Sequence, residues 1–504
     1  MRKNRTLALA LSILLSPAVW PQEISRVEPP SWWTGMKTDL QLLVQGEGVG
    51  ASDCRIEGMK GVKVSAVHRA DSPNCLFVDV DIARKAKPGT CTLVFTLGGR
   101  EIRYPYEIAA REETARESYS TADLIYLIVP DRFANGDPSN DSTPATREAA
   151  DRSRPSGRHG GDIQGVIDHL DYIADLGATA IWCTPLLGDD APRGSYHGYA
   201  CSDYYHIDPR YGSNALYREL VRQAHGKGLK MVMDVVTNHA GTEHWWMQDP
   251  PFRDWVHLND PYVNTNHTMS LALDPNASRA DRAVMEEGWF VPEMPDMNLD
   301  NPFVLKYFQQ WAVWWIEFAG LDGFRVDTWF YNEKEPMSRW AEAVTDEYPG
   351  FNIVGEVWSL NPDFVAYWQA GHPNSDGFDS HLPSVMDFPL QNAVTRALSV
   401  PGQDISRVYD ALSHDFVYRD LSHMLIFLSN HDIARIGDTF GGDPRRMKIA
   451  FTLLATLRGI PQLFYGDEQM LLTGNPRRDD GRLRMDFPGG WEGDTVDLFT
   501  PQGR

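Results

Sequence analysis

The sequence contains little cysteine. Only five of its 504 residues are cysteines, and none of them forms a Cys-x-x-Cys pair or stands at a zinc-type spacing from histidine. The cysteines therefore give no indication of a zinc site. We expect most of these side chains to be small, buried and apolar. They are Cys54, Cys75, Cys91, Cys183 and Cys201.

Basic residues are few compared with acidic ones. The chain has 47 Lys and Arg against 69 Asp and Glu, which gives a formal net charge of −22. Nucleic acid and anionic membrane surfaces would repel such a chain at long range. We therefore expect a neutral ligand and no nucleic-acid partner.

Long apolar runs are missing, apart from one near the N-terminus. The run from Leu7 to Val19 follows three basic residues, Arg2, Lys3 and Arg5, and is too short to span a bilayer. This arrangement is typical of a signal peptide. We predict that residues 1–22 are removed, and that the protein is secreted or periplasmic and has no membrane segment afterwards. Export permits disulfides, but the sequence does not define which cysteines pair.

Two patterns of apolar residues divide the rest of the chain. In residues 23–112, short segments alternate apolar and polar positions between Gly, Pro, Asp and Asn, which predicts an immunoglobulin-like β-sandwich. In residues 113–504, eight apolar strand-like runs alternate with amphipathic helices, which predicts a (β/α)₈ TIM barrel. We expect helices at 163–176, 215–227, 301–319, 336–348, 363–370 and 444–458.

Two further features concern the barrel region. About sixty residues, 240–300, separate the third strand from its helix, and we expect them to form an inserted subdomain. After Glu468 the sequence is polar and rich in Gly, without the pattern of an eighth helix. We expect a C-terminal β-domain to be absent or truncated here.

Three acidic residues stand at the ends of predicted barrel strands. Asp327 ends the fourth run, Glu356 the fifth and Asp432 the seventh. Because parallel barrel strands end at one rim, these carboxylates are expected to converge. A carboxylate and a carboxylic acid roughly 5 Å apart hydrolyse a glycosidic bond with retention of configuration. Arg325, two positions before Asp327, is expected to keep it ionised, whereas a drier setting is expected to raise the pKa of Glu356.

Taken singly, each of these residues has a plainer explanation. A lone acid at a strand end is usually a helix cap or a solvated turn residue. His239 and His431, which end the third run and precede Asp432, are equally compatible with core or capping roles. The case for a catalytic site depends on the joint arrangement.

The segments around these residues resemble the four signature regions of the α-amylase superfamily, in the same order. They are DVVTNH (234–239), GFRVDT (323–328), GEVW (355–358) and FLSNHD (427–432). MPDMN (294–298) resembles a fifth region found in neopullulanases, cyclomaltodextrinases and maltogenic amylases, although cyclomaltodextrinases often have Lys in place of Asp296. The predicted N-terminal sandwich fits that subgroup as well.

The resemblance implies a role for each matched residue. It implies Asp327 as nucleophile, Glu356 as acid and base, and Asp432 as stabiliser of the transition state. Tyr199 matches the aromatic residue on which the family stacks the sugar. Trp358 matches an aromatic on the acceptor side. The substrate-binding residues implied in this way are His197, Tyr199, His239, Arg325, Trp358 and His431.

A second group of residues suits a hard cation. DRFANGDPSND (131–141) and GGD (160–162) place many oxygen ligands after the first predicted strand. An Asx-rich turn without metal explains the residues equally well. The resemblance favours structural Ca²⁺. The ligands that it implies are Asn135, Asp137, Asn140, Asp141, the Gly160 carbonyl and Asp162.

The sequence therefore predicts a retaining hydrolase of α-1,4-glucosidic bonds in maltooligosaccharides, cyclodextrins or pullulan, with neopullulanase as the preferred label. A transglycosylating or α-1,6-acting member of the same superfamily is the first alternative, because the same carboxylates serve both outcomes. A non-catalytic glucan-binding protein on an amylase scaffold is the alternative from another class. A homodimer is a further expectation, because in this subgroup the N-terminal domain often covers a neighbour's active site.

Overall fold

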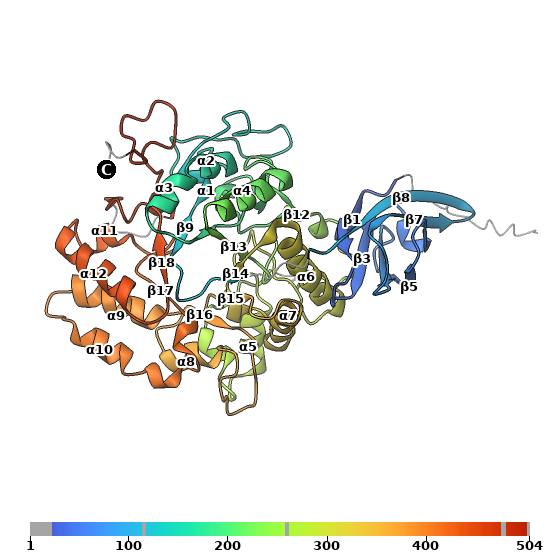
Figure 1. Ribbon diagram of the computed structural model, residues 1–504. Coiled ribbons are helices and arrows are strands. Elements are labelled where there is room, and N and C mark those ends of the chain that lie inside the picture. Colours follow the sequence, from blue (N-terminus) through green and yellow to red (C-terminus); the bar gives the residue numbers. More distant parts are fainter. Residues whose placement is uncertain (1–22, 113–116, 258–261, 475–479, 501–504) are drawn as a thin grey trace, which may run out of the picture.

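The computed structural model describes residues 23–112, 117–257, 262–474 and 480–500 (Figure 1). The predicted signal peptide, residues 1–22, lies outside the described residues. Two regions follow one another along the chain, an all-β region and then a barrel.

The N-terminal region is a sandwich of two four-stranded sheets, ordered β1-β3-β6-β5 and β2-β8-β7-β4. Buried side chains such as Leu42, Val78, Leu93 and Ile108 are contributed by strands of both sheets. The alternating sequence pattern therefore predicted this domain correctly. The strands are Arg26–Glu28, Ser31–Trp33, Leu40–Gln45, Asp53–Glu57, Val62–Arg69, Cys75–Ile82, Gly89–Leu97 and Arg100–Ala109, numbered β1 to β8.

The second region is a closed barrel of eight parallel strands, as predicted. Nearly every residue of these strands is buried, because side chains point either into the barrel or under its helices. In chain order the strands are β9 (Ile125–Ile128), β10 (Ala180–Cys183), β13 (Lys230–Val235), β14 (Gly323–Val326), β15 (Asn352–Gly355), β16 (Ser384–Met386), β17 (Met424–Phe427) and β18 (Ile460–Phe464).

Helices surround the barrel at the expected places, and several begin at side-chain caps. Asn301 caps α6 and Asp443 caps α12, each followed by a proline that suits the first helical turn. The helix expected at 163–176 is divided at His169 into α2 and α3. The helices are α1 (Pro130–Phe133), α2 (Ile163–Asp168), α3 (Leu170–Asp175), α4 (Asn214–Gly226), α5 (Arg279–Glu286), α6 (Pro302–Trp315), α7 (Lys334–Glu347), α8 (Pro362–Tyr367), α9 (Phe388–Ser399), α10 (Ser406–Leu412), α11 (Ile436–Thr439), α12 (Pro444–Thr456) and α13 (Asp480–Leu483).

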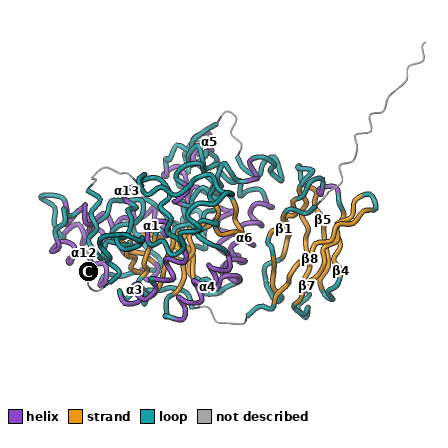
Figure 2. The backbone as a smooth tube through the Cα atoms, turned by 90° about the horizontal axis from the view of Figure 1, so that it is seen from above, coloured by secondary structure: helices purple, strands orange, loops and turns teal. Residues whose placement is uncertain are grey.

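The sandwich lies beside α6, on one side of the barrel (Figure 2). Tyr307 of α6 donates to Glu28 at 2.9 Å, and the Gln310 amide donates to the Gln41 carbonyl at 2.9 Å. A two-stranded ribbon of β11 (Leu187–Gly188) and β12 (Asp203–Ile207) leaves the barrel after β10. Among the helices described, none has both the length and the apolar character needed to cross a bilayer.

The long connection between β13 and α6 lies over the same end of the barrel as the predicted acids. It contains α5 and short 3-10 turns rather than a separate sheet. An isolated bridge pairs His239, at the start of the connection, with Asp296 near its end. The connection therefore returns to the barrel beside the residues that follow β13.

Candidate active site

The strand register places Asp327 and Glu356 side by side. Val326 and Gly355 are partners at the ends of β14 and β15, and the two acids are the next residues on each strand. Both side chains are largely buried, with 10% of the surface of Asp327 and 6% of that of Glu356 exposed to solvent. Asp432 follows β17 and its side chain is 19% exposed.

The guanidinium of Arg325 connects the two acids. Its Nη1 lies 2.7 Å from Asp327 Oδ1, and its Nη2 lies 3.0 Å from Glu356 Oε2. Nη1 is also 3.0 Å from Asp234 Oδ1. Arg325 itself is fully buried, so these ion pairs lie in a setting of low dielectric. One cation thus holds three carboxyl groups at the end of the barrel.

The predicted effect of Arg325 on Asp327 was only partly correct. Arg325 favours the charged form of Asp327, but burial has the larger effect and raises the pKa of Asp327 to about 6. Burial likewise raises the pKa of Glu356 to about 7, again opposed by Arg325. The spacing of Arg325 and Asp327 does not indicate that both acids are buried where two strand ends meet at one rim. The order of the two pKa values still suits a base-like Asp327 and an acid-like Glu356.

A strained residue helps to orient Glu356. Thr328 has a φ of 45°, a left-handed conformation that is rare for a β-branched side chain. Its N–H donates to Glu356 Oε2 at 3.1 Å. Strain of this kind costs on the order of 1–3 kcal/mol and is often found at functional sites.

Asp432 is held by its chain neighbour His431 and by Arg484 from the segment after the last barrel strand. Arg484 Nη2 lies 2.8 Å from Asp432 Oδ1, and His431 Nε2 lies 3.2 Å from Oδ2. Arg484 also donates from Nε to the His431 carbonyl at 2.8 Å. Sequence reasoning missed Arg484, because it lies in the polar segment after the last strand and has no periodic pattern around it.

A hydrogen-bonded network links Asp432 to the other two acids. Tyr199 Oη lies 2.6 Å from His431 Nε2 and donates to Asp234 Oδ2 at 2.9 Å. Asp234 in turn contacts Arg325. The Tyr199 and His431 rings are stacked, with 5.5 Å between centroids and 6° between planes. Asp234 was not predicted as a site residue, although it opens the DVVTNH segment that the sequence singled out.

The histidines around the acids are neutral. Burial lowers the pKa values of His197, His239 and His431 to about 3. His197 Nδ1 accepts the Tyr199 N–H at 2.9 Å. His239 stacks on Phe290, and its buried Nε2 has no hydrogen-bond partner among the described residues. A neutral imidazole nitrogen of this kind suits a sugar hydroxyl.

Two aromatic side chains near the acids pack on other rings. Trp358, two residues after Glu356, stacks on Phe388 with 5.0 Å between ring centroids. Phe290, from the inserted connection, packs edge-to-face against Tyr331. The neighbouring Trp289 instead donates from its indole to the His257 carbonyl.

The predicted cation ligands lie together after β9, away from the acids. Asn135 Nδ2 donates to Asp141 Oδ1 at 2.8 Å, and Asn140 Nδ2 donates to Asp162 Oδ2 at 2.9 Å. Gly160 has a positive φ and lies against the Asp141 carboxylate. Asp137 is different, because its exposed carboxylate accepts from Ser139 in an Asx turn. The Oδ1 atoms of Asn135 and Asn140 are buried without a hydrogen-bond partner among the described residues, which fits an oxygen-seeking cation.

An eight-stranded barrel gathers two buried carboxyls around one arginine, with a third acid near them, and these are the groups that retaining glycoside hydrolases use. Residues 127–484 match the family model for the alpha amylase catalytic domain, and residues 26–112 match that for the cyclomaltodextrinase N-terminal domain. The chain belongs to the alpha-amylase family.

Individual relatives support the same placement. A cyclomaltodextrinase of Geobacillus thermopakistaniensis is 33% identical over 69% of this chain and 56% of its own length. Neopullulanase 2 of Thermoactinomyces vulgaris is 32% identical over 72% of this chain and 58% of its own. The chain thus spans less than two thirds of these relatives. The structure of an Anoxybacillus alpha-amylase matches with a TM-score of 0.63 and 31% identity, over 74% of this chain and 76% of that one.

Proposed function

We propose that this protein hydrolyses α-1,4-glucosidic bonds in maltooligosaccharides, cyclodextrins or pullulan, with retention of configuration. The observation that carries the proposal is the contact of one buried guanidinium, Arg325, with both Asp327 and Glu356. This arrangement brings a nucleophile and an acid to the same bond. The match to the cyclomaltodextrinase N-terminal domain supports the substrate class.

The proposed reaction has two steps. Asp327 attacks the anomeric carbon while Glu356 gives its proton to the leaving glycosidic oxygen, which forms a covalent glucosyl ester on Asp327. Glu356, now ionised, then takes a proton from water, and the water oxygen displaces Asp327. Asp432, held by Arg484 and His431, is placed to bind the sugar hydroxyls as positive charge develops on the ring.

The products from three substrates test this proposal. Pullulan, amylose and β-cyclodextrin are each incubated with the protein, and the products are separated by chromatography. Panose from pullulan and maltose from the other two are expected for a neopullulanase-like enzyme. Products longer than the substrate would favour transglycosylation, and maltotriose from pullulan would favour α-1,6 cleavage. No release of reducing ends from any of them would contradict hydrolysis.

The two raised pKa values predict a narrow pH optimum. Asp327 must be ionised, so kcat/KM is expected to fall below about pH 6. Glu356 must be protonated, so it is expected to fall above about pH 7. The measurement is kcat/KM for maltotetraose against pH. In Glu356→Gln the remaining activity is expected to lose its alkaline limb, and an unchanged alkaline limb would contradict the assignment.

We also propose that the Asn135–Asp162 cluster holds a structural Ca²⁺. Asn135, Asn140 and Asp141 would supply side-chain oxygens, and Gly160 its carbonyl. The ion would join the segment after β9 to the start of α2. The two orphan amide oxygens support this assignment, since a buried acceptor without a donor is costly.

The calcium proposal predicts a change in stability. Saturating CaCl₂, about 100 times the Kd, is expected to stabilise the chelator-treated protein by about 2.7 kcal/mol. Asp141→Asn is expected to lose most of this gain in thermal unfolding. Asp151→Asn is the control, because Asp151 accepts from Ser153 in an Asx turn outside the proposed site. Equal Tm values with and without Ca²⁺ in the wild type would contradict the proposal.

We further propose export to a secreted or periplasmic location. The basic and apolar N-terminal residues support it. N-terminal sequencing of the protein made with its leader is expected to begin near residue 23, and an intact Met1 would contradict export. The homodimer stays a prediction.

A further inference from the structure

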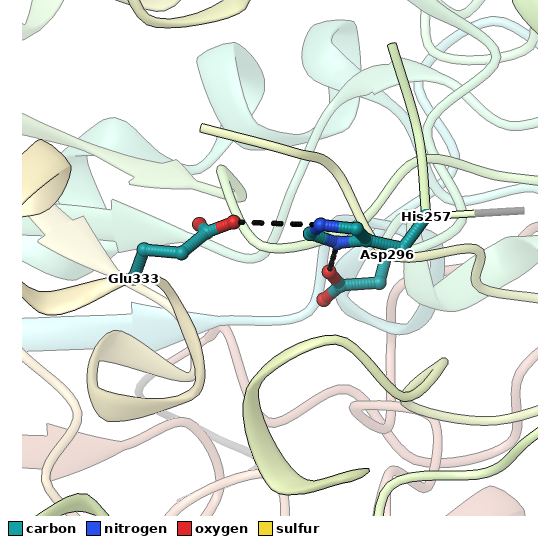
Figure 3. Close-up of side chains that lie close together, drawn as sticks. All are labelled: His257, Asp296 and Glu333. Carbon is teal, nitrogen blue, oxygen red and sulfur yellow. Dashed lines mark hydrogen bonds and ion pairs between the residues drawn. The ribbon is translucent and has the colours of Figure 1, made fainter. Parts of the chain in front are cut away.

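Three side chains meet where the inserted connection returns to the barrel. His257 lies within the connection, Asp296 near its end, and Glu333 at the N-terminus of α7 (Figure 3). One nitrogen or oxygen of each lies within 4.8 Å of the others. None of the three is used in the proposed reaction or in the proposed calcium site.

The imidazole of His257 lies between the two carboxyl groups. Its Nδ1 hydrogen-bonds to Asp296 Oδ2 at 2.7 Å, while its Nε2 faces Glu333 Oε1 at 4.0 Å (Figure 3). With Asp296 as acceptor, Nδ1 carries the proton and Nε2 a lone pair. Glu333 Oε1 is buried and has no hydrogen-bond partner among the described residues. Two electron-pair donors thus face each other across a short gap.

Neighbouring groups hold each of the three residues in place. Asn238 Nδ2 donates to Asp296 Oδ1 at 2.9 Å. The Trp289 indole donates to the His257 carbonyl at 2.7 Å, and the Leu299 N–H donates to Glu333 Oε2 at 3.3 Å. These hydrogen bonds hold His257 and Glu333 in place. The two remaining atoms, His257 Nε2 and Glu333 Oε1, therefore face each other.

We propose that His257 and Glu333 bind a divalent cation of the zinc type, with Asp296 orienting the histidine. The 4.0 Å between His257 Nε2 and Glu333 Oε1 is slightly less than the sum of two zinc bonds of about 2.0–2.2 Å each, so one ion can reach both atoms, and a slight closure of the gap would bring the angle between the two bonds toward tetrahedral. A carboxylate on Nδ1 behind a metal-facing Nε2 is a recurring support for such sites. Asp296 stays on Nδ1, on the far side of the ring from the ion, and water completes the coordination.

The ligand types distinguish this site from the proposed calcium site. Ca²⁺ takes oxygen ligands, as the Asn135–Asp162 cluster provides. The site at His257 and Glu333 instead includes an imidazole nitrogen, which favours Zn²⁺, Ni²⁺ or Co²⁺. The surroundings also favour a cation, because the Asp296 carboxyl is buried and the Glu333 side chain is only 11% exposed. A bound dication would offset the cost of charging both groups.

A cation here would fix the inserted connection to the segment that carries Asp327. Glu333 follows Asp327 by six residues, and Tyr331 between them packs on Phe290 of the connection. The ion would fix His257 and Asp296 to this segment. It is therefore expected to stabilise the position of His239 and Phe290 beside the acids.

Titration of the chelator-treated protein with ZnCl₂ tests the site. Calorimetry on the wild type in the presence of CaCl₂ is expected to show one bound Zn²⁺ per chain. His257→Gln and Glu333→Gln are each expected to lose this site, and Asp296→Asn to weaken it about 10- to 100-fold. Unfolding curves in chelator show whether each variant is folded. His423→Gln is the control, because His423 and Asp420 form a similar pair, 2.9 Å apart, on the exposed surface.

Cobalt supplies a second measurement that does not depend on activity. One equivalent of Co²⁺ is expected to give visible absorption bands in the wild type and in His423→Gln, and to lose them in His257→Gln. Absence of Zn²⁺ binding in the folded wild type would overturn the proposal. Equal binding by wild type, His257→Gln and Glu333→Gln would also overturn it. Because no substrate is present, either result leaves the proposed hydrolysis untouched.

Discussion

Replacing Asp327 with Asn is expected to lower kcat on maltooligosaccharides by on the order of 10⁴-fold, equivalent to about 5.4 kcal/mol of transition-state stabilisation. Asn keeps the shape of the side chain and can still accept from Arg325, but it cannot form the glucosyl ester. The loss is expected to be equally large for glucosyl fluoride, because an activated leaving group does not replace a nucleophile. Steady-state kinetics on both substrates provides the measurement.

Asp175→Asn is the matched control for this variant. Asp175 is an exposed residue of α3, so its amide variant should retain the wild-type rate. Thermal unfolding of Asp327→Asn should show a folded protein, since the change removes one of three carboxylates that compete for Arg325. A folded Asp327→Asn variant that retains the wild-type rate would contradict the assigned role.

Replacing Glu356 with Gln is expected to have the second largest effect, with a different dependence on substrate. General acid catalysis contributes about 10²- to 10⁴-fold, and the loss on maltooligosaccharides is expected to fall in this range. Fluoride leaves without a proton, so formation of the glucosyl ester from glucosyl fluoride should be nearly unaffected. A burst of fluoride release followed by slow turnover is therefore expected.

The contrast between the two variants separates the roles of the two acids. If Glu356→Gln loses the fluoride burst as completely as Asp327→Asn does, Glu356 is not the acid. If Asp327→Asn instead retains the burst, the two roles are reversed. Arg325 contacts both residues, so its own replacement is not informative on this question.

The sequence predicted the barrel and the position of the acids because both follow from local patterns. Each barrel strand is a short apolar run that ends in polar residues, and parallel strands end at one rim. For this reason the sequence predicted that Asp327 and Glu356 lie at the same rim, and they do follow adjacent strands there. The sandwich was predicted for a similar reason, since its alternating positions reflect one buried face for each strand.

Features that depend on long-range packing were not predictable in this way. Arg484 reaches Asp432 from the far end of the chain, within a segment that has no periodic pattern. The raised pKa of Asp327 depends on how deeply two adjacent strand ends are buried, which the Arg325 spacing alone does not indicate. The meeting of His257 with Glu333 depends on how the inserted connection folds back, and composition does not indicate it.

Arg325 accounts for much of the chemistry at this end of the barrel. A single fully buried cation faces Asp234, Asp327 and Glu356, so it compensates only part of their combined charge. The remaining proton is best held by the group with the higher pKa, which is Glu356. This arrangement favours an ionised Asp327 and a protonated Glu356, the pair that the proposed retaining mechanism needs.

Trapping the covalent intermediate tests the central claim most directly. The protein is incubated with a fluorinated glucosyl fluoride that forms the ester quickly and hydrolyses slowly, then digested and analysed by mass spectrometry. A single glucosyl adduct on the peptide that contains Asp327 is the predicted result. An adduct on another residue, or product of inverted configuration without any adduct, would contradict the proposed mechanism.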